Sequence, residues 1–208
     1  MTTAFEFKLV PLDCPTCGAG VRARGEDVVY YCTACRNGYR LDPSDWSLDL
    51  VETAFVSAPH IQVQEYRPFW LLPARISITR RQASGRGFTG LLQSFLGSEH
   101  AAAEGGEGTF AVPAFQAPLE SVTRLVRDYT RALPELREKL GEGLLGGCYG
   151  QQDAQKLAHY ALIATEVEKP DTLLNLDYHI EFGEPRLLGV PFQTHGGTAR
   201  DAIFNIEV

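Results

Sequence analysis

The chain has 208 residues, of which 44% are hydrophobic and 22% are charged, and its formal net charge is -7. A chain of this size and composition can bury one good core and carry a small additional module. The acidic balance argues against a generic binder of nucleic acid or of anionic membranes, which needs a basic face, and no apolar run approaches the length of a membrane span.

The first predicted element is a half-buried strand over residues 5–10, where apolar and polar side chains alternate. Two CxxC pairs follow, Cys14 with Cys17 and Cys32 with Cys35, and fourteen residues separate the pairs. Each tight turn can direct two thiolates at one ion, and four thiolates fill a tetrahedral zinc site. Because no coordination position stays open for water or substrate, we expect one structural Zn²⁺ and no metal catalysis there.

Short strands over residues 28–31 and 38–41 flank the second cysteine pair and predict a zinc ribbon over residues 1–45. A turn-rich cluster at 42–45, with a proline, marks its boundary. So small a module buries little core, so metal binding supplies much of its folding energy. Nothing near the N-terminus resembles a signal peptide, and paired thiols held by a metal indicate a reducing compartment, so we expect a cytoplasmic protein.

Residues 46–208 predict an α+β domain that is mainly antiparallel β, with two or three helices. Alternation predicts its first strands, which cover residues 46–58, 65–70, 76–79 and 110–115, with an interruption at Pro73. Helical periodicity predicts helices over residues 118–133, 134–140 and 153–168. Near the C-terminus, residues 174–182 and 186–192 predict a hairpin closed by a turn at 183–185, and residues 202–208 a last strand.

Residues 80–109 differ in kind, because they are rich in Gly, Ser and Ala and resemble a flexible or inserted segment. Inside this segment, five apolar side chains fall on one helical face: Phe88, Leu91, Leu92, Phe95 and Leu96. One interpretation is an amphipathic segment that docks in a partner groove or on a lipid surface, and the other is a short helix packed on the chain's own core. Both interpretations stay open. We also expect the aromatic strand around Phe69 and Trp70 to contact a partner.

Three further groups of residues are candidates for chemistry. Asp177, His179 and Glu181 share one face of one predicted strand and could bind a metal ion, although alternation also predicts a solvated outer sheet face there. His195 precedes two glycines, which suits a catalytic loop but is more typical of a plain turn. Cys148 could be a reactive thiol before a helix, or a small apolar residue beside a flexible turn, and the second interpretation is favoured.

Several phrases resemble known zinc-ribbon proteins. The runs CPTCG and CTACRNGYRL resemble the zinc ribbon of general transcription factors. The later runs PFWLLPARISI, FAVPAFQ and LLGVPFQTHGGTARDAIFNIEV resemble uncharacterised bacterial zinc-ribbon proteins, in which the ribbon precedes a "PFW/VPAF" α+β domain. The resemblance implies a protein partner that belongs, for some such proteins, to membrane-associated scaffolds of the stomatin/flotillin type. It does not explain the segment 80–109.

The preferred functional prediction is therefore a non-enzymatic cytoplasmic adaptor or scaffold protein, with a structural zinc ribbon, that binds a protein partner. One alternative is a nucleic-acid-binding zinc-ribbon protein, which the six acidic against five basic side chains of the ribbon disfavour. A second alternative is an enzyme with a site around Asp177, His179 and Glu181. The sequence leaves the partner and the oligomeric state open.

Overall fold

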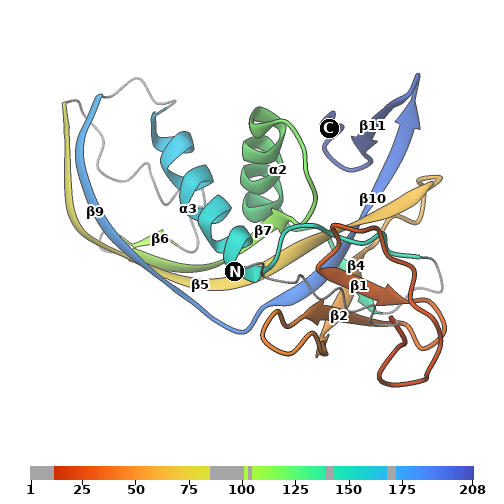
Figure 1. Ribbon diagram of the computed structural model, residues 1–208. Coiled ribbons are helices and arrows are strands. Elements are labelled where there is room, and N and C mark those ends of the chain that lie inside the picture. The colour runs from red at the N-terminus through yellow and green to blue at the C-terminus, as the bar shows by residue number, and fades with distance from the viewer. Residues whose placement is uncertain (1–11, 85–100, 103–104, 139–142, 168–171) are drawn as a thin grey trace, which may run out of the picture.

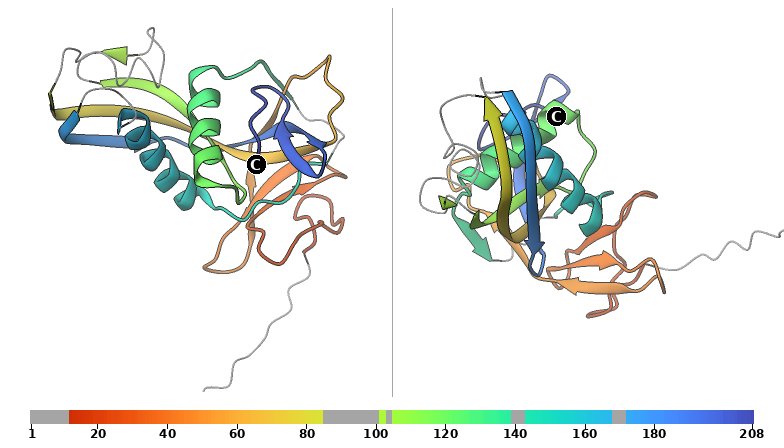
Figure 2. Two further views of the ribbon diagram at one scale, coloured as in Figure 1. Left: turned by 90° about the horizontal axis from the view of Figure 1, so that it is seen from above. Right: turned by 90° about the vertical axis from the view of Figure 1, so that its left-hand side faces the viewer.

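The computed structural model describes residues 12–84, 101–102, 105–138, 143–167 and 172–208. An eight-stranded sheet forms its centre, two helices lie side by side against this sheet, and a three-stranded sheet packs at one end (Figures 1 and 2). The α+β fold with mostly antiparallel strands is confirmed. None of the described helices combines the length and the apolarity that crossing a bilayer requires.

The large sheet has the order β6-β7-β5-β10-β4-β8, with β9 beside β5 and β11 beside β10. Its strands are β4 (Thr53–Val56), β5 (Glu65–Ser84), β6 (Ala101–Ala102), β7 (Gly105–Pro113), β8 (Leu136–Glu138), β9 (Thr172–Phe182), β10 (Arg186–His195) and β11 (Thr198–Asp201). Every neighbouring pair is antiparallel except β4 with β10. β10 lies between β5 and β4, so it connects the strands β6, β7 and β5 to the strands β4 and β8.

The central strand β5 continues through Pro73, so the predicted interruption there is wrong. The Pro73 carbonyl oxygen accepts a hydrogen bond from Gly183 N–H at 2.7 Å, which shows that this backbone position faces the β9–β10 side. On that side the ladder already breaks between Phe182 and Arg186. The missing proline N–H therefore removes no ladder bond, which is why this proline is tolerated inside a central strand.

The predicted hairpin between β9 and β10 is also wrong. The two strands follow one another along a single edge of β5, where β10 pairs with residues 65–71 and β9 pairs with residues 74–84 (Figure 1). The residues 183–185 bridge the two ladders without reversing the chain. Alternation of apolar and polar side chains predicts a strand but not its partner, and β5 is long enough to pair with both strands in turn.

The helices α2 (Leu119–Arg131) and α3 (Gln151–Val167) confirm two of the three predicted helices. The short helix over 134–140 is wrong where the structure describes it, because residues 136–138 form β8 and pair with β4. Tertiary pairing thus overrides the local preference. The small buried side chains of α3, which include Ala154, Ala158 and Ala161, allow this helix to pack closely against Trp70 in the main core.

The three-stranded sheet consists of β1 (Val29–Cys32), β2 (Asn37–Leu41) and β3 (Leu48–Val51), in that order. We call residues 12–51, which hold this sheet and all four paired cysteines, the cysteine module. The third strand lies beyond the predicted boundary at residue 45. Val29 and Val51 belong to the same apolar core as Trp70, so the module shares the core of the large domain.

A glycine marks how closely the cysteine module approaches the large sheet. A Cβ atom added at Gly38 would lie 2.2 Å from Thr53 Oγ1 and 2.8 Å from Leu187 Cδ1. These distances are far below a normal van der Waals contact, so only glycine fits at this point of β2. The cysteine module is therefore packed tightly on β4 and β10.

The predicted segment 80–109 is partly strand, because β5 extends to Ser84 and β7 begins at Gly105. The amphipathic run Phe88, Leu91, Leu92, Phe95 and Leu96 lies outside the described residues, and so does the predicted strand 5–10. Both stay predictions.

Candidate metal centre

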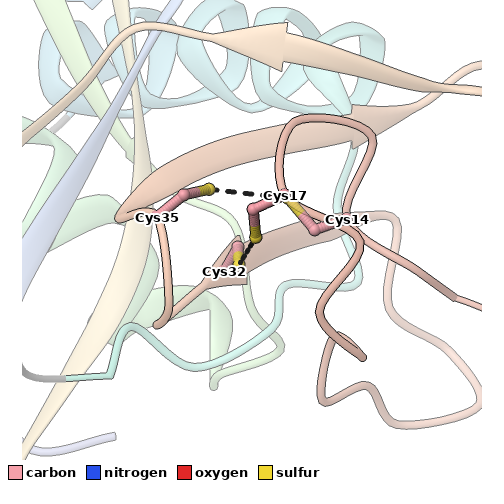
Figure 3. Close-up of side chains that lie close together, drawn as sticks. All are labelled: Cys14, Cys17, Cys32 and Cys35. Carbon is pink, nitrogen blue, oxygen red and sulfur yellow. Dashed lines mark hydrogen bonds between the residues drawn. The ribbon is translucent and has the colours of Figure 1, made fainter.

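The four cysteines of the module converge on one point (Figure 3). Their Sγ atoms all lie within 4.8 Å of one another. The two closest pairs join one cysteine of each CxxC turn, with 3.5 Å between Cys14 and Cys35 Sγ and 3.6 Å between Cys17 and Cys32 Sγ. A zinc–sulfur bond of about 2.3 Å in a tetrahedron gives sulfur–sulfur distances of about 3.8 Å. The thiols are therefore arranged to bind one metal ion.

The two cysteine pairs lie in two turns of the same type. In the first turn Gly18 N–H donates to the Cys14 carbonyl oxygen at 2.8 Å, and in the second Arg36 N–H donates to the Cys32 carbonyl oxygen at 2.7 Å. Gly18 and Arg36 both have a positive φ, 71° and 61°. A left-handed backbone is natural for glycine but strained for arginine, so the second turn stores a small conformational cost.

Tyr39 completes the site and was not predicted from the sequence. Its side chain is 1% exposed, and its Oη lies 3.1 Å from Cys14 Sγ, 3.8 Å from Cys35 Sγ and 2.7 Å from Thr16 Oγ1. The register of β1 and β2 places Asn37 opposite Cys32, so Tyr39 falls two residues further on the same face. Alternation within NGYRL carries this signal once the sheet register is known.

The electrostatics of the four thiols favour a bound cation. Burial alone would raise the pKa of Cys14, but hydrogen bonds with Tyr39 and with the backbone of Cys17 and Thr16 lower it to about 6. For Cys17, a backbone hydrogen bond with Ala19 lowers the pKa, whereas burial and the neighbouring thiols raise it to about 12. Cys14 therefore loses its proton more readily than Cys17. A bound metal ion would favour the thiolate form of all four cysteines, because an opposite charge stabilises the ionised group.

Asp177, His179 and Glu181 do not form a comparable centre. All three are exposed on β9, and His179 Nε2 lies 3.9 Å from Glu181 Oε1. Glu181 pairs in register with Arg75 of β5, whose Nη2 contacts Glu107 Oε1 of β7 at 2.5 Å. This face is a ladder of solvated charges. Within the described residues, the four cysteines are the only group of side chains placed to hold a metal ion.

His195 stands at the turn between β10 and β11. Gly196 and Gly197 both have a positive φ, 59° and 89°, and the backbone of His195 pairs with Thr198. Two left-handed residues are what a two-residue hairpin of type I′ requires. The glycine pair is thus explained by the turn, which supports the interpretation of this motif as a plain loop.

Phe69 and Trp70 cannot form the expected contact surface, because both are 0% exposed. Phe69 packs against Phe115 and Tyr129. Trp70 belongs to the main core, and its Nε1–H donates to the Tyr149 carbonyl oxygen at 2.9 Å. Neighbouring residues of a strand point to opposite faces, and here both faces of β5 are covered. The prediction of a partner surface at these two residues is therefore wrong.

Cys148 is half-buried three residues before α3, beside two hollows of about 540 and 460 Å³. The first hollow is lined by charged side chains that include Arg24, Asp27 and Arg67. Among the described residues that line either hollow there is no histidine to serve as a base for the thiol. The surroundings of Cys148 thus favour a packing residue over a nucleophile.

Comparison of the chain with protein families, curated proteins and solved structures finds no match.

Proposed function

We propose that Cys14, Cys17, Cys32 and Cys35 bind one structural Zn²⁺ in a zinc ribbon, and that the protein is a non-enzymatic cytoplasmic adaptor that binds a protein partner. The observation that carries this proposal is the convergence of four thiols, with sulfur–sulfur distances of 3.5 and 3.6 Å in the closest pairs. Four protein ligands complete a zinc site, so the ion stabilises the fold and leaves no position for a substrate.

The other polar groups support an adaptor more than an enzyme. The predicted enzymatic alternative needs Asp177, His179 and Glu181 to converge, yet these side chains extend from an exposed sheet face. A catalytic centre needs groups that are held in a common pocket with perturbed protonation. We therefore infer that the protein acts by binding a partner on its surface and not by catalysis in a pocket.

The nucleic-acid alternative is less well supported, because many arginines of the described surface are already paired with carboxylates. These pairs are Arg40–Asp49, Arg67–Glu65, Arg75–Glu107, Arg186–Glu52 and Arg200–Glu207. A phosphate would have to displace a carboxylate at each of them. We expect no salt-dependent mobility shift with duplex or single-stranded nucleic acid.

Affinity capture from the native host tests the adaptor proposal. The bait is the zinc-loaded full chain, and the matched variant lacks residues 86–100, which include the predicted amphipathic run. We expect a specific partner with the full chain and its loss with the deletion, while both proteins keep one zinc per chain. Separating membrane from soluble fractions before capture tests the membrane-associated setting. Capture of no specific protein by the full chain would contradict the adaptor proposal.

A further inference from the structure

The four cysteines of the module differ in how far the chain covers them. Cys14 and Cys32 are only 3% and 2% exposed, whereas Cys17 is exposed. The turn that carries Cys17 is open as well, because residues 15–18 are all exposed and a Cβ atom added at Gly18 would meet nothing within 4 Å. Among the residues that the structure describes, little therefore stands between solvent and Cys17.

The opposite side of the site is closed by Tyr39. This side chain is buried, and its Oη lies 3.1 Å from Cys14 Sγ and 3.8 Å from Cys35 Sγ. The side chains within hydrogen-bond distance of the Cys17 sulfur, in the described part of the chain, are other thiols alone. A small reagent dissolved in water therefore reaches the site at Cys17 and not at the sulfurs beside Tyr39.

The sulfur that lies closest to Cys17 comes from the other cysteine turn. Cys17 Sγ and Cys32 Sγ are 3.6 Å apart, and Figure 3 shows the two side chains pointing toward each other. A disulfide bond is about 2.05 Å long, so the two sulfurs would have to approach by about 1.5 Å. The open turn around Cys17 has room for this movement.

This pair of sulfurs can be oxidised to a disulfide by hydrogen peroxide. In a zinc-loaded chain all four sulfurs are thiolates, so their exposure decides which of them peroxide reaches first. The Cys17 thiolate attacks one oxygen of the peroxide, the O–O bond breaks and hydroxide leaves, which produces a sulfenic acid. The Cys32 thiolate then attacks this sulfur, the S–O bond breaks and a second hydroxide leaves. The two sulfurs lose two electrons in total, and the peroxide gains them.

We propose that Cys17 is a peroxide-sensitive modification site and that its oxidation product is a disulfide with Cys32. This disulfide removes two of the four ligands, so the chain no longer holds the ion. Cys32 ends β1, and Val29 of the same strand lies in the main core, so the change reaches the strand that joins the cysteine module to the large domain. The inference rests on the proposed zinc-ribbon adaptor and adds its regulation by an oxidant. A thiol reductant reverses the reaction, as a switch requires.

Treatment of the zinc-loaded full chain with hydrogen peroxide tests the inference. A coloured zinc chelator measures release of the ion, and mass spectrometry of unreduced peptides, after free thiols have been alkylated, identifies the disulfides. We expect the first disulfide to join Cys17 and Cys32 and to form in step with the release of zinc. Dithiothreitol followed by added zinc should restore one zinc per chain.

Two variants connect the release of zinc with Cys17. Cys17→His keeps a zinc ligand but has no sulfur to oxidise, so it should release zinc about tenfold more slowly, or slower still. Cys148→Ser is the control, since it removes the fifth cysteine without changing the four ligands, and it should release zinc at the unchanged rate. The zinc content before peroxide is added shows whether each variant is loaded. Where Cys17→His does not load zinc, the disulfide map of the unchanged protein decides.

Three outcomes would overturn the inference. These are a first disulfide other than Cys17–Cys32, release of zinc while Cys17 stays reduced, and equal rates of release in Cys17→His and the unchanged protein. A chain that holds one zinc and keeps it in peroxide would refute the inference and leave the proposed function intact. A chain that holds no zinc before peroxide is added would refute the proposed zinc ribbon, and the inference would fail with it.

Discussion

The cysteine module and the C-terminal hook (residues 198–208) are both held in place by polar groups, but by groups of different kinds. Each is a peripheral segment in which several polar groups of the chain converge on one point. The module converges on four thiols that are placed to hold a metal ion, whereas the hook converges on the buried carboxylate of Asp201. That carboxylate accepts the Tyr129 hydroxyl at 2.7 Å and the N–H groups of Ile203, Phe204 and Ile206 at 3.0, 2.9 and 2.7 Å.

The difference lies in where the compensating partners come from. In the proposed zinc site the four thiolates are compensated by an ion from solution, so the proposal makes the fold of the module dependent on metal supply. The charge of Asp201 is compensated by donors of the same chain, which are always present. The fold of a peripheral segment that is closed by a metal therefore depends on the supply of that metal. The fold of a segment that is closed by hydrogen bonds within the chain does not.

Metal removal should separate the two regions most strongly. A strong zinc chelator, or the variant Cys32→Ala, should unfold the cysteine module and leave the hook closed, because structural zinc contributes on the order of 10 kcal/mol to folding. Amide hydrogen exchange measured by mass spectrometry should show lost protection in β1–β3 and retained protection in residues 198–208. Cys148→Ser is the matched cysteine control and should keep one zinc. Unchanged protection of β1–β3 without metal would contradict the comparison.

The reciprocal change is Asp201→Ala, which should open the hook and leave zinc binding intact. Removing the carboxylate leaves the buried Tyr129 hydroxyl and three N–H groups without their acceptor, at a cost of about 3–5 kcal/mol. Urea unfolding of the zinc-loaded protein measures this loss, and metal analysis should still find one zinc per chain. Asp177→Ala, at an exposed position, should change stability by less than about 0.5 kcal/mol. A loss of zinc in Asp201→Ala would show that the two regions are not independent.

Gly38→Ala tests whether the module depends on its packing as well as on its metal. The added Cβ would meet Thr53 Oγ1 at 2.2 Å, so we expect a loss of about 1–3 kcal/mol in the free energy of unfolding with zinc bound. Gly20→Ala is the control within the same module, because nothing lies within 4 Å of its added Cβ. Equal stability of the two variants would mean that the module is held by the ion alone.

Alkaline pH should weaken the hook through Tyr129. Burial, reinforced by the charge of Asp201, raises the pKa of Tyr129 above that of a free tyrosine. The stabilising contribution of Tyr129 is therefore complete below about pH 10 and is lost as the pH rises, because the unfolded chain then releases this proton while the folded chain keeps it. Urea unfolding at a series of pH values should show a fall that is shallower in Tyr129→Phe by about 1.4 kcal/mol per pH unit. Identical slopes would exclude Tyr129 as the cause.

The smallest expected effect is at the two cysteine turns. Arg36→Gly should stabilise the zinc-loaded protein by about 1 kcal/mol, because φ 61° is strained for arginine and natural for glycine. Gly18→Ala should have the opposite effect at the equivalent position of the first turn. Thermal unfolding of both variants measures the difference. A destabilised Arg36→Gly would mean that the arginine side chain contributes more than its backbone costs.

The sequence predicted the elements whose signal is local. The spacing of the two CxxC motifs is sufficient to predict a shared metal site. The helical periodicity that predicted α2 and α3 can be read within each segment alone. Pairing was harder, because alternation in β9 and β10 fits a hairpin as well as two successive partners of β5. The local pattern at 134–140 predicted a helix, but residues 136–138 form β8 because they pair with β4.

The sequence predicted the four cysteines of the site but not the residue that packs beside them. Tyr39 approaches the cysteines through the register of β1 and β2, which no spacing rule states. Phe69 and Trp70 illustrate the opposite error. A pair of aromatic residues in a strand is equally compatible with a binding surface and with a core, and only the layers that cover both faces of β5 decide for the core.

The collinear arrangement of β9 and β10 along β5 has a consequence for synthesis of the chain. A ribosome releases residues 65–84 long before residues 172–195, which form one complete edge of that strand. Until they arrive, the nascent chain exposes a long strand edge of unpaired N–H and C=O groups that other chains can pair with. Folding must also close large loops before this ladder forms, which slows it. We therefore expect the yield of native protein to depend on chaperones and on translation rate more than its final stability would suggest.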